Sequence, residues 1–156
     1  MGFATHLGPW LLGTVKNTTG TTVGSIRNMG ATVVAQTIPV TASTFVNLTG
    51  TLGAIPAGSL ITGVQIITST LFDSATTLIV AIGGTNTATA TTITAAGVYP
   101  ITLAAGFAPT AANSGSTDDL ITYTATGTPT SGAATIVITY VVRDSSGAAN
   151  PTSTQN

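Results

Sequence analysis

Side chains that could exchange a proton or bind a metal ion are few among the 156 residues of this chain. The chain contains one histidine, His6, and it has no cysteine and no glutamate. A Ser-His-Asp triad would need His6, but no Gly-x-Ser-x-Gly nucleophile turn accompanies it. We therefore expect no catalytic residue and no cofactor, and we expect His6 to make a hydrogen bond or an interface contact.

A pair of carboxylates, Asp118 and Asp119, is the nearest approach to a metal site. Adjacent residues of a strand point to opposite faces, so these two cannot readily share a proton or one ion. A calcium site needs several oxygen ligands from one loop, and no further acidic residue lies nearby in the sequence. We predict that the pair starts a strand and solvates a loop, and that no metal is bound.

The remaining charged groups suggest turns and surface positions. Asp73 lies in the run Phe72–Ala75 (FDSA) between two strand-like segments, where Asp-Ser is ordinary turn chemistry. Arg27 and Arg143 are the two arginines, and each is either a surface charge or a buried partner of an aspartate.

Charge is unusually sparse along the whole chain. Charged residues make up 4 % of the sequence, whereas about 25 % is typical of globular domains. Such a chain cannot neutralise many phosphates, so nucleic acid is not expected as a partner. No apolar run reaches the ~18 residues of a membrane helix, so no membrane partner is expected either. A surface with little charge repulsion suits a subunit of an ordered assembly.

The elements that must carry these side chains are predicted to be strands. Thr, Val and Ile favour strands, whereas the helix formers Glu, Lys, Arg, Gln and Met are nearly missing. We predict almost no helix and an all-β fold, a two-sheet antiparallel β-sandwich that is jelly-roll-like, with an N-terminal arm and hairpin. The nine predicted strands are Leu11–Lys16, Val23–Arg27, Ala31–Thr37, Ser43–Thr49, Ser59–Thr68, Thr76–Gly83, Gly97–Leu103, Asp119–Thr126 and Ala133–Arg143.

Glycine and proline give several of these strands more detail. Pro39 is expected to stop the third strand, Gly63 to form a bulge, and Pro100 to mark an edge or a bulge. The loop 127–132 is expected to join its two flanking strands as a hairpin. The nearly continuous apolar run Thr76–Gly83 is predicted to be buried on both faces.

The chain divides into three parts. Residues 1–30 are predicted to form an arm and hairpin, residues 31–144 the sandwich body, and residues 145–156 a flexible polar tail. Large apolar groups on an arm need a surface to cover. The arm residues predicted to form an interface are Phe3, His6, Leu7, Trp10, Leu11 and Leu12.

The order of several central segments resembles the cement or decoration proteins on the heads of tailed bacteriophages. These segments are Ile55–Ile66 (IPAGSLITGVQI), Phe72-Asp73, Thr77–Gly83 (TLIVAIG), Ala96–Ile101 (AGVYPI) and Gly132–Tyr140 (GAATIVITY). The resemblance covers about residues 53 to 142. It implies a jelly-roll-like sandwich that assembles as dimers or trimers on the outside of a capsid, and it brings no catalytic residue. The N-terminal arm has no counterpart in that pattern.

The expected function is therefore that of a structural virion protein, not an enzyme. The resemblance implies binding to the major capsid protein on the outer surface of the capsid, with a homotrimer preferred over a dimer. The alternative is a tail-fibre or adhesin-type β-domain that binds glycans, which would need an exposed aromatic groove.

Overall fold

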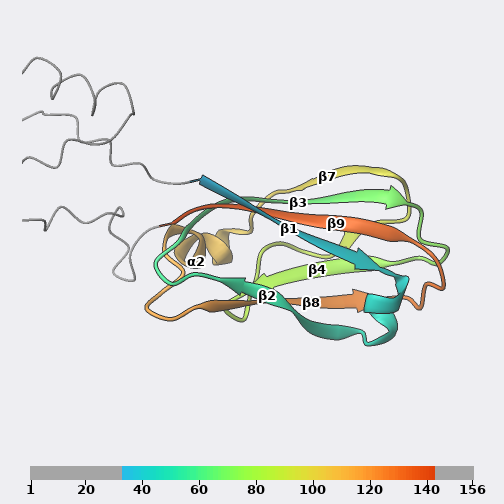
Figure 1. Cartoon of the computed structure of the whole chain (residues 1–156), viewed down its shortest axis with the longest axis horizontal. Helices are drawn as coiled ribbons and strands as arrows, with labels where there is room; N and C mark the ends of the chain where they lie inside the picture. Colours follow the sequence, from blue (N-terminus) through green and yellow to red (C-terminus); the bar gives the residue numbers. More distant parts are fainter. Residues whose placement is uncertain (1–32, 143–156) are drawn as a thin grey trace, which may run out of the picture.

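The computed structural model describes residues 33–142, which form two β-sheets packed face to face (Figure 1). These residues carry the predicted all-β sandwich. In chain order the strands are β1 (Val33–Thr41), β2 (Thr49–Ile55), β3 (Leu60–Thr70), β4 (Thr77–Ile82), β5 (Thr85–Asn86), β6 (Thr91–Thr92), β7 (Gly97–Ile101), β8 (Asp119–Thr126) and β9 (Ala133–Val141).

The order of the strands is that of a jelly roll. One sheet, called here the β1 sheet, has the order β1-β9-β3-β7, and the other, the β2 sheet, has the order β2-β8-β4-β5, with β6 also paired to β4. All pairs are antiparallel. Successive long strands fall in opposite sheets, whereas the two-residue strands β5 and β6 stay in the same sheet as β4, so most connections cross from one sheet to the other.

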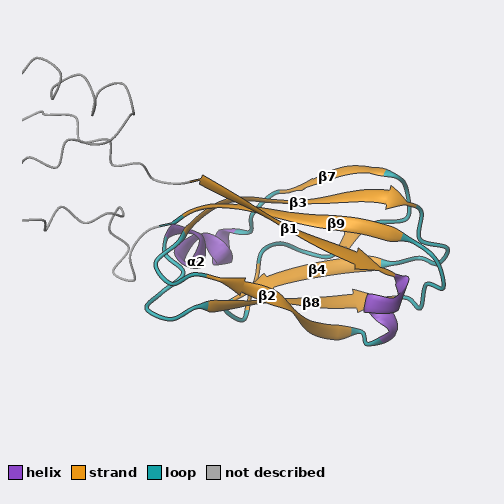
Figure 2. Ribbon diagram, viewed as in Figure 1, coloured by secondary structure: helices purple, strands orange, loops and turns teal. Residues whose placement is uncertain are grey.

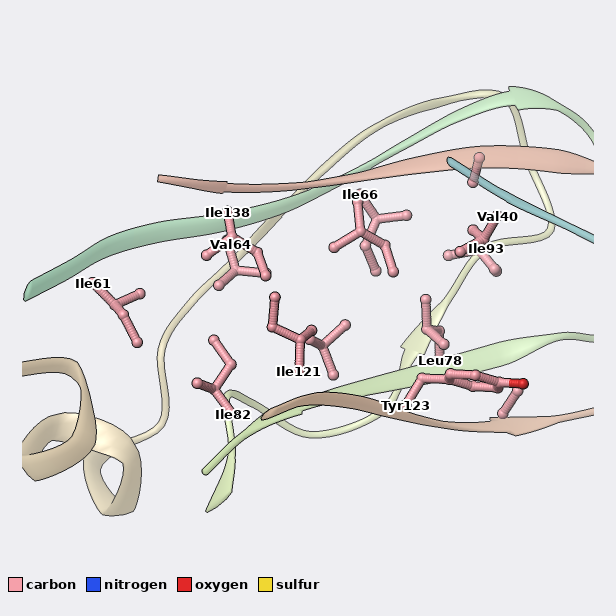
Figure 3. Packing of buried hydrophobic residues seen from close by; sticks show 14 of the residues in the cluster. Val40, Ile61, Val64, Ile66, Leu78, Ile82, Ile93, Ile121, Tyr123 and Ile138 are labelled. Carbon is pink, nitrogen blue, oxygen red and sulfur yellow. The ribbon is translucent and has the colours of Figure 1, made fainter. Parts of the chain in front are cut away.

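Side chains that alternate along the long strands fill the space between the sheets (Figure 3). In β9, for example, Ile136 and Ile138 point inward and are fully buried. Burying each such side chain contributes about 1.5–3 kcal/mol relative to leaving it exposed. The largest fully buried apolar residues are Phe45, Phe107, Ile55, Ile66, Leu78, Ile82, Ile93, Ile121, Ile136, Ile138 and Val40.

Two details predicted from glycine and proline are confirmed. The register of β3 against β9 shifts between Ile61 and Gly63, which is the bulge expected at this glycine. A Cβ at Gly63 would lie 2.9 Å from Thr139 Oγ1, so the close approach of the neighbouring strand also favours glycine. Pro100 lies in β7, which is an edge strand of the β1 sheet.

The predictions around β1 and the segment after it were wrong. Pro39 does not stop the strand, because β1 lies at a sheet edge and its ladder to β9 continues through Pro39 opposite Thr135. The predicted strand Ser43–Thr49 is instead a 3₁₀ helix, η1 (Ala42–Val46), followed by a turn. Reciprocal capping between Thr41 and Thr44 starts this helix, which carries the chain from one sheet to the other.

Two further predictions failed because they concerned contacts between distant residues. The loop 127–132 is not a hairpin, since it joins β8 in the β2 sheet to β9 in the β1 sheet. Strand β4 is not buried on both faces, because Leu78, Val80 and Ile82 are buried whereas the residues between them are only half-buried.

The helices within the described residues are few and short, which agrees with the prediction of almost no helix. Besides η1 they are η2 (Ala105–Phe107) and α2 (Ala108–Ala112). Figure 2 shows them at the two ends of the sandwich, η1 at one end and α2 at the other. None of the helices within residues 33–142 is long and apolar enough to cross a membrane.

Candidate interaction surfaces

The predicted interface residues of the arm lie outside the described residues, and so do the two arginines. These residues are Phe3, His6, Leu7, Trp10, Leu11 and Leu12, with Arg27 and Arg143. The site chemistry within residues 33–142 therefore comes from three aspartates, which are the only charged residues in that range.

Asp73 joins two loops that are far apart in the sequence. Its Oδ1 accepts a hydrogen bond of 2.8 Å from the backbone N–H of Thr130, and its Oδ2 accepts one from the Thr130 hydroxyl. These bonds favour the charged form, so the hydroxyl and the N–H of Thr130 lower the pKa of the Asp73 carboxyl. Asp73 is thus more than a turn residue, since it ties the β3–β4 turn to the loop before β9.

Asp118 and Asp119 have separate neighbours. Asp118 Oδ1 accepts a 3.0 Å hydrogen bond from the backbone N–H of Ala57. Asp119 begins β8, as predicted, and its carboxylate lies against Gly83, where an added Cβ would be 2.7 Å from Oδ2. Partial burial raises the pKa of the Asp119 carboxyl. Within residues 33–142 no three acidic, histidine or cysteine side chains come together as metal ligands.

Aromatic packing closes the end of the sandwich near η1, called here the aromatic end. The ring of Phe45 lies 5.5 Å from the rings of both Phe72 and Tyr123. The Tyr123 hydroxyl donates to the backbone carbonyl of Asn47 at 2.8 Å and lies against the carbonyl of Thr44. These contacts tie η1 and the segment after it to β8.

Backbone and serine groups close the opposite end, called here the hydrogen-bonded end. The Ser114 hydroxyl donates to the carbonyl of Pro56 and accepts from the N–H of Ser59, both at 2.9 Å. The Ser114 N–H donates in turn to the carbonyl of Ser59 at 3.0 Å. With the bond between Asp118 and Ala57, these contacts hold the β2–β3 turn to the segment before β8.

The outer faces of both sheets are uncharged. Asp73 and Asp118 lie in loops, and Asp119 shares the inward side of β8 with Ile121 and Tyr123. The outer face of the β2 sheet is rich in threonine, with Thr49, Thr51, Thr77, Thr92, Thr122, Thr124 and Thr126. The outer face of the β1 sheet includes Val33, Ala35, Thr37, Pro39, Gln65, Ile67, Val98, Pro100, Thr135, Val137 and Thr139.

These faces offer methyl and hydroxyl groups to a partner. Across the β2 sheet, the hydroxyls of Thr77 and Thr126 are 2.6 Å apart and bond to each other. Val33 and Val98 on the β1 sheet are 66 % and 59 % exposed. Groups of this kind can pack against a protein surface, but they cannot neutralise a charged ligand.

A comparison of the chain with protein-family models, with curated proteins and with solved structures finds no match in any of the three.

Sequence reasoning missed two residues that the structure makes prominent. The role of Thr130 as partner of Asp73 depends on a contact across 57 positions, and no local pattern signals it. Gln36 did leave a signal, because it is the one amide in the apolar strand β1 and it shares the inward side with Val34 and Ile38.

Proposed function

We propose that the chain is a structural virion protein, a capsid cement subunit that binds the shell of the major capsid protein from outside and stabilises it. The observation that carries this proposal is the pair of uncharged outer faces on the sandwich. Such a body offers two broad surfaces for protein contact, and its three carboxylates are spread over loops and a strand start. The ordered segments that resemble phage decoration proteins support the same proposal.

The chemistry of these faces determines how the shell would be held. Protein interfaces of standard size bury about 1,200–2,000 Å² and gain stability chiefly from apolar contact at their centre. Without charged side chains on either face, ion pairs contribute little to such a contact. Binding through them should therefore depend only weakly on salt, which screens charges and not apolar burial.

The arm is the second part of the proposal. Phe3, Leu7 and Trp10 would act as apolar anchors on the capsid protein or on a neighbouring subunit, together with Leu11 and Leu12. A homotrimer is the assembly that the resemblance favours for this role.

The position of the aromatic side chains favours cement over the glycan-binding alternative. Sugar recognition uses exposed aromatic platforms. Within residues 33–142 the phenylalanines and two of the tyrosines are buried, and Tyr99 is half-buried with its hydroxyl bonded to the carbonyl of Ala95. Glycan binding by the purified chain would favour the alternative.

Binding to capsids tests the proposal directly. The full chain and a variant lacking residues 1–12 are each mixed with shells of the encoding phage that lack this protein, and bound copies are counted after sedimentation. We expect the full chain to saturate the shells equally at low and at 1 M salt, and the deletion to reduce occupancy at least tenfold. Unchanged occupancy of the deletion variant would show that residues 1–12 are not needed for binding to the capsid.

A second measurement tests the location. Mass spectrometry of purified virions should detect the chain in many copies per particle, and antibodies against it should label intact capsids. Failure to find it in virions would contradict the proposal as a whole.

A further inference from the structure

In the part of the chain that the structure describes, β1 has a free edge that lacks the features that usually protect an exposed strand. Within residues 33–142, β1 pairs with β9 on one side and with no strand on the other. Exposed edges are normally blunted by charge, proline or a bulge. The β2 edge has a register shift between Thr51 and Gly53, and β7 contains Pro100. The first six residues of β1, 33–38, have none of these.

The direction of the backbone groups shows which residues face this edge. Next to β9, the N–H of Ala42 donates to the carbonyl of Gly132, whereas the N–H of Thr41 turns away and donates to Thr44 Oγ1. The register of β1 against β9 runs without a shift, so this direction alternates along the strand. The backbone groups that point to the free edge are therefore those of Val33, Ala35, Thr37 and Pro39. Because Pro39 faces this edge, its missing N–H removes no hydrogen bond between β1 and β9.

The side chains on the inward side of β1 are incompletely covered. Val34, Gln36 and Ile38 are half-buried, whereas Ile136 and Ile138 opposite them on β9 are fully buried. Gln36 Oε1 is enclosed and accepts no hydrogen bond from any described residue. Leaving a buried acceptor without a hydrogen bond disfavours the folded state. Among the described residues, the edge therefore leaves both apolar area and an acceptor without a partner.

We propose that β1 pairs antiparallel with β1 of a second copy of this chain, about a two-fold axis that passes through Gln36. Gln36 then faces Gln36 in a non-hydrogen-bonded pair, where opposing side chains are closest. Turning the amide towards the edge provides Oε1 with a donor, the Nε2 of the second copy. Val34 faces Ile38 on the same side, which is a favourable pair of β-branched residues.

The sequence of β1 favours this register over the neighbouring registers. Ala35 faces Thr37, and these pairs exchange both of their backbone hydrogen bonds. Pro39 faces Val33 at the end of the pairing, where its missing N–H removes only the outermost bond. A slip by two residues would place Pro39 opposite Ala35 and Gln36 opposite Ile38. Pro39 would then no longer lie at the end of the pairing, and Gln36 would no longer face Gln36. The strand is thus complementary to itself, which is the requirement for a two-fold interface.

Cysteine cross-linking tests the register in the full chain, which has no cysteine of its own. Across a non-hydrogen-bonded pair the two Cα atoms are about 4.5 Å apart, within the range of a disulfide. We expect Gln36→Cys to form a covalent dimer under mild oxidation. Val34→Cys is the matched control, because its counterpart in the second copy lies four residues along the strand, about 13 Å away.

Solution mass tests the contact itself. Ala35→Pro removes an N–H that faces the free edge and leaves the ladder to β9 intact, as Pro39 already does. Pairing through β1 would join two of the trimers proposed above, so we expect the wild-type chain to contain an even number of copies. We expect Ala35→Pro to halve its mass with an unchanged circular dichroism spectrum.

Three results would overturn the proposal. They are a monomeric wild-type chain, as expected if residues 23–27 of the same chain cover the edge, equal cross-linking of the two cysteine variants, and an unchanged mass of Ala35→Pro. The contact is independent of capsid binding, so its failure would leave the proposed cement function untouched.

Discussion

The two ends of the sandwich are closed by different interactions. At the aromatic end, the rings of Phe45, Phe72 and Tyr123 pack together beneath η1. At the hydrogen-bonded end, Ser114 and Asp118 hold the β2–β3 turn through backbone bonds. Apolar burial acts over the whole side chain, whereas a hydrogen bond is exchanged for one with water on unfolding. We therefore expect the aromatic end to contribute more to the free energy of unfolding.

At the aromatic end, backbone also packs closely against a ring. A Cβ at Gly132 would lie 2.3 Å from Cδ1 of Phe72, and Gly132 has a φ of 134°. Only glycine fits both the space and the backbone angle at this position. The loop before β9 is thus pressed directly against the ring of Phe72, while Asp73 next to it binds Thr130 in the same loop.

Truncation of the central ring should have the largest effect. Phe45→Ala empties a fully buried site and should lower the free energy of unfolding by about 3–5 kcal/mol. Urea denaturation followed by circular dichroism measures this change. Val46→Ala is the matched control, because Val46 is the next residue of η1 and is 78 % exposed; it should change stability by less than about 0.5 kcal/mol. Equal effects of the two substitutions would contradict the ranking of the two ends.

Removal of the serine hydroxyl should have an intermediate effect. Ser114→Ala leaves the N–H of Ser59 and the carbonyl of Pro56 without this partner, and should cost about 1–3 kcal/mol. The same urea titration applies, with Ser116→Ala at an exposed position nearby as control. A loss as large as that of Phe45→Ala would mean that the hydrogen bonds at one end contribute as much to the free energy of unfolding as the aromatic packing at the other.

The carboxylates should give the smallest effects, with opposite signs at the two ends. The pKa of Asp73 is lowered in the folded chain, so its stabilising contribution is complete above its unfolded value of 3.8 and is lost as the pH falls through the folded pKa. Asp73→Asn should lower the urea midpoint at pH 7, and the difference from wild type should shrink below pH 3.8. A difference that stayed constant down to pH 2 would contradict a charged acceptor at Thr130.

Asp119 provides the matched comparison. Its pKa is raised by burial, so its charge disfavours the folded chain above pH 3.8 and ceases to do so once the carboxyl is protonated. Asp119→Asn should therefore leave the urea midpoint at pH 7 unchanged or raise it. A lower midpoint at pH 7 would mean that the Asp119 carboxylate has a favourable partner.

The features that were predicted correctly from the sequence depend on local preferences, and the features that were missed depend on contacts between distant residues. The all-β sandwich, the bulge at Gly63 and the edge position of Pro100 follow from local preferences of residues for strands and from their backbone angles. The 3₁₀ helix at Ala42–Val46 was missed, because alternation in this segment resembles a strand. Its helical form depends on the capping between Thr41 and Thr44 and on the docking of Phe45 into the core.

The contacts between loops could not be predicted in this way. Turn residues in 127–132 indicate a change of direction, but they do not indicate which sheet receives the next strand. The partnership of Asp73 with Thr130 depends on that choice, and so does the position of β1 at an edge of the sheet within residues 33–142. Only Gln36, a polar residue on an apolar side, marked that edge in the sequence.

The strand order also determines when each strand can find its partner during synthesis. No long strand pairs with its neighbour in the chain, and β1 pairs only with β9 at the far end of the described residues. Ribosomes add roughly 5–20 residues per second, so β1 waits several seconds for Ala133–Val141 to emerge. During that time both edges of a neutral, β-prone strand are open. On crowded polysomes, nascent copies of this chain are therefore exposed to one another before any of them can fold.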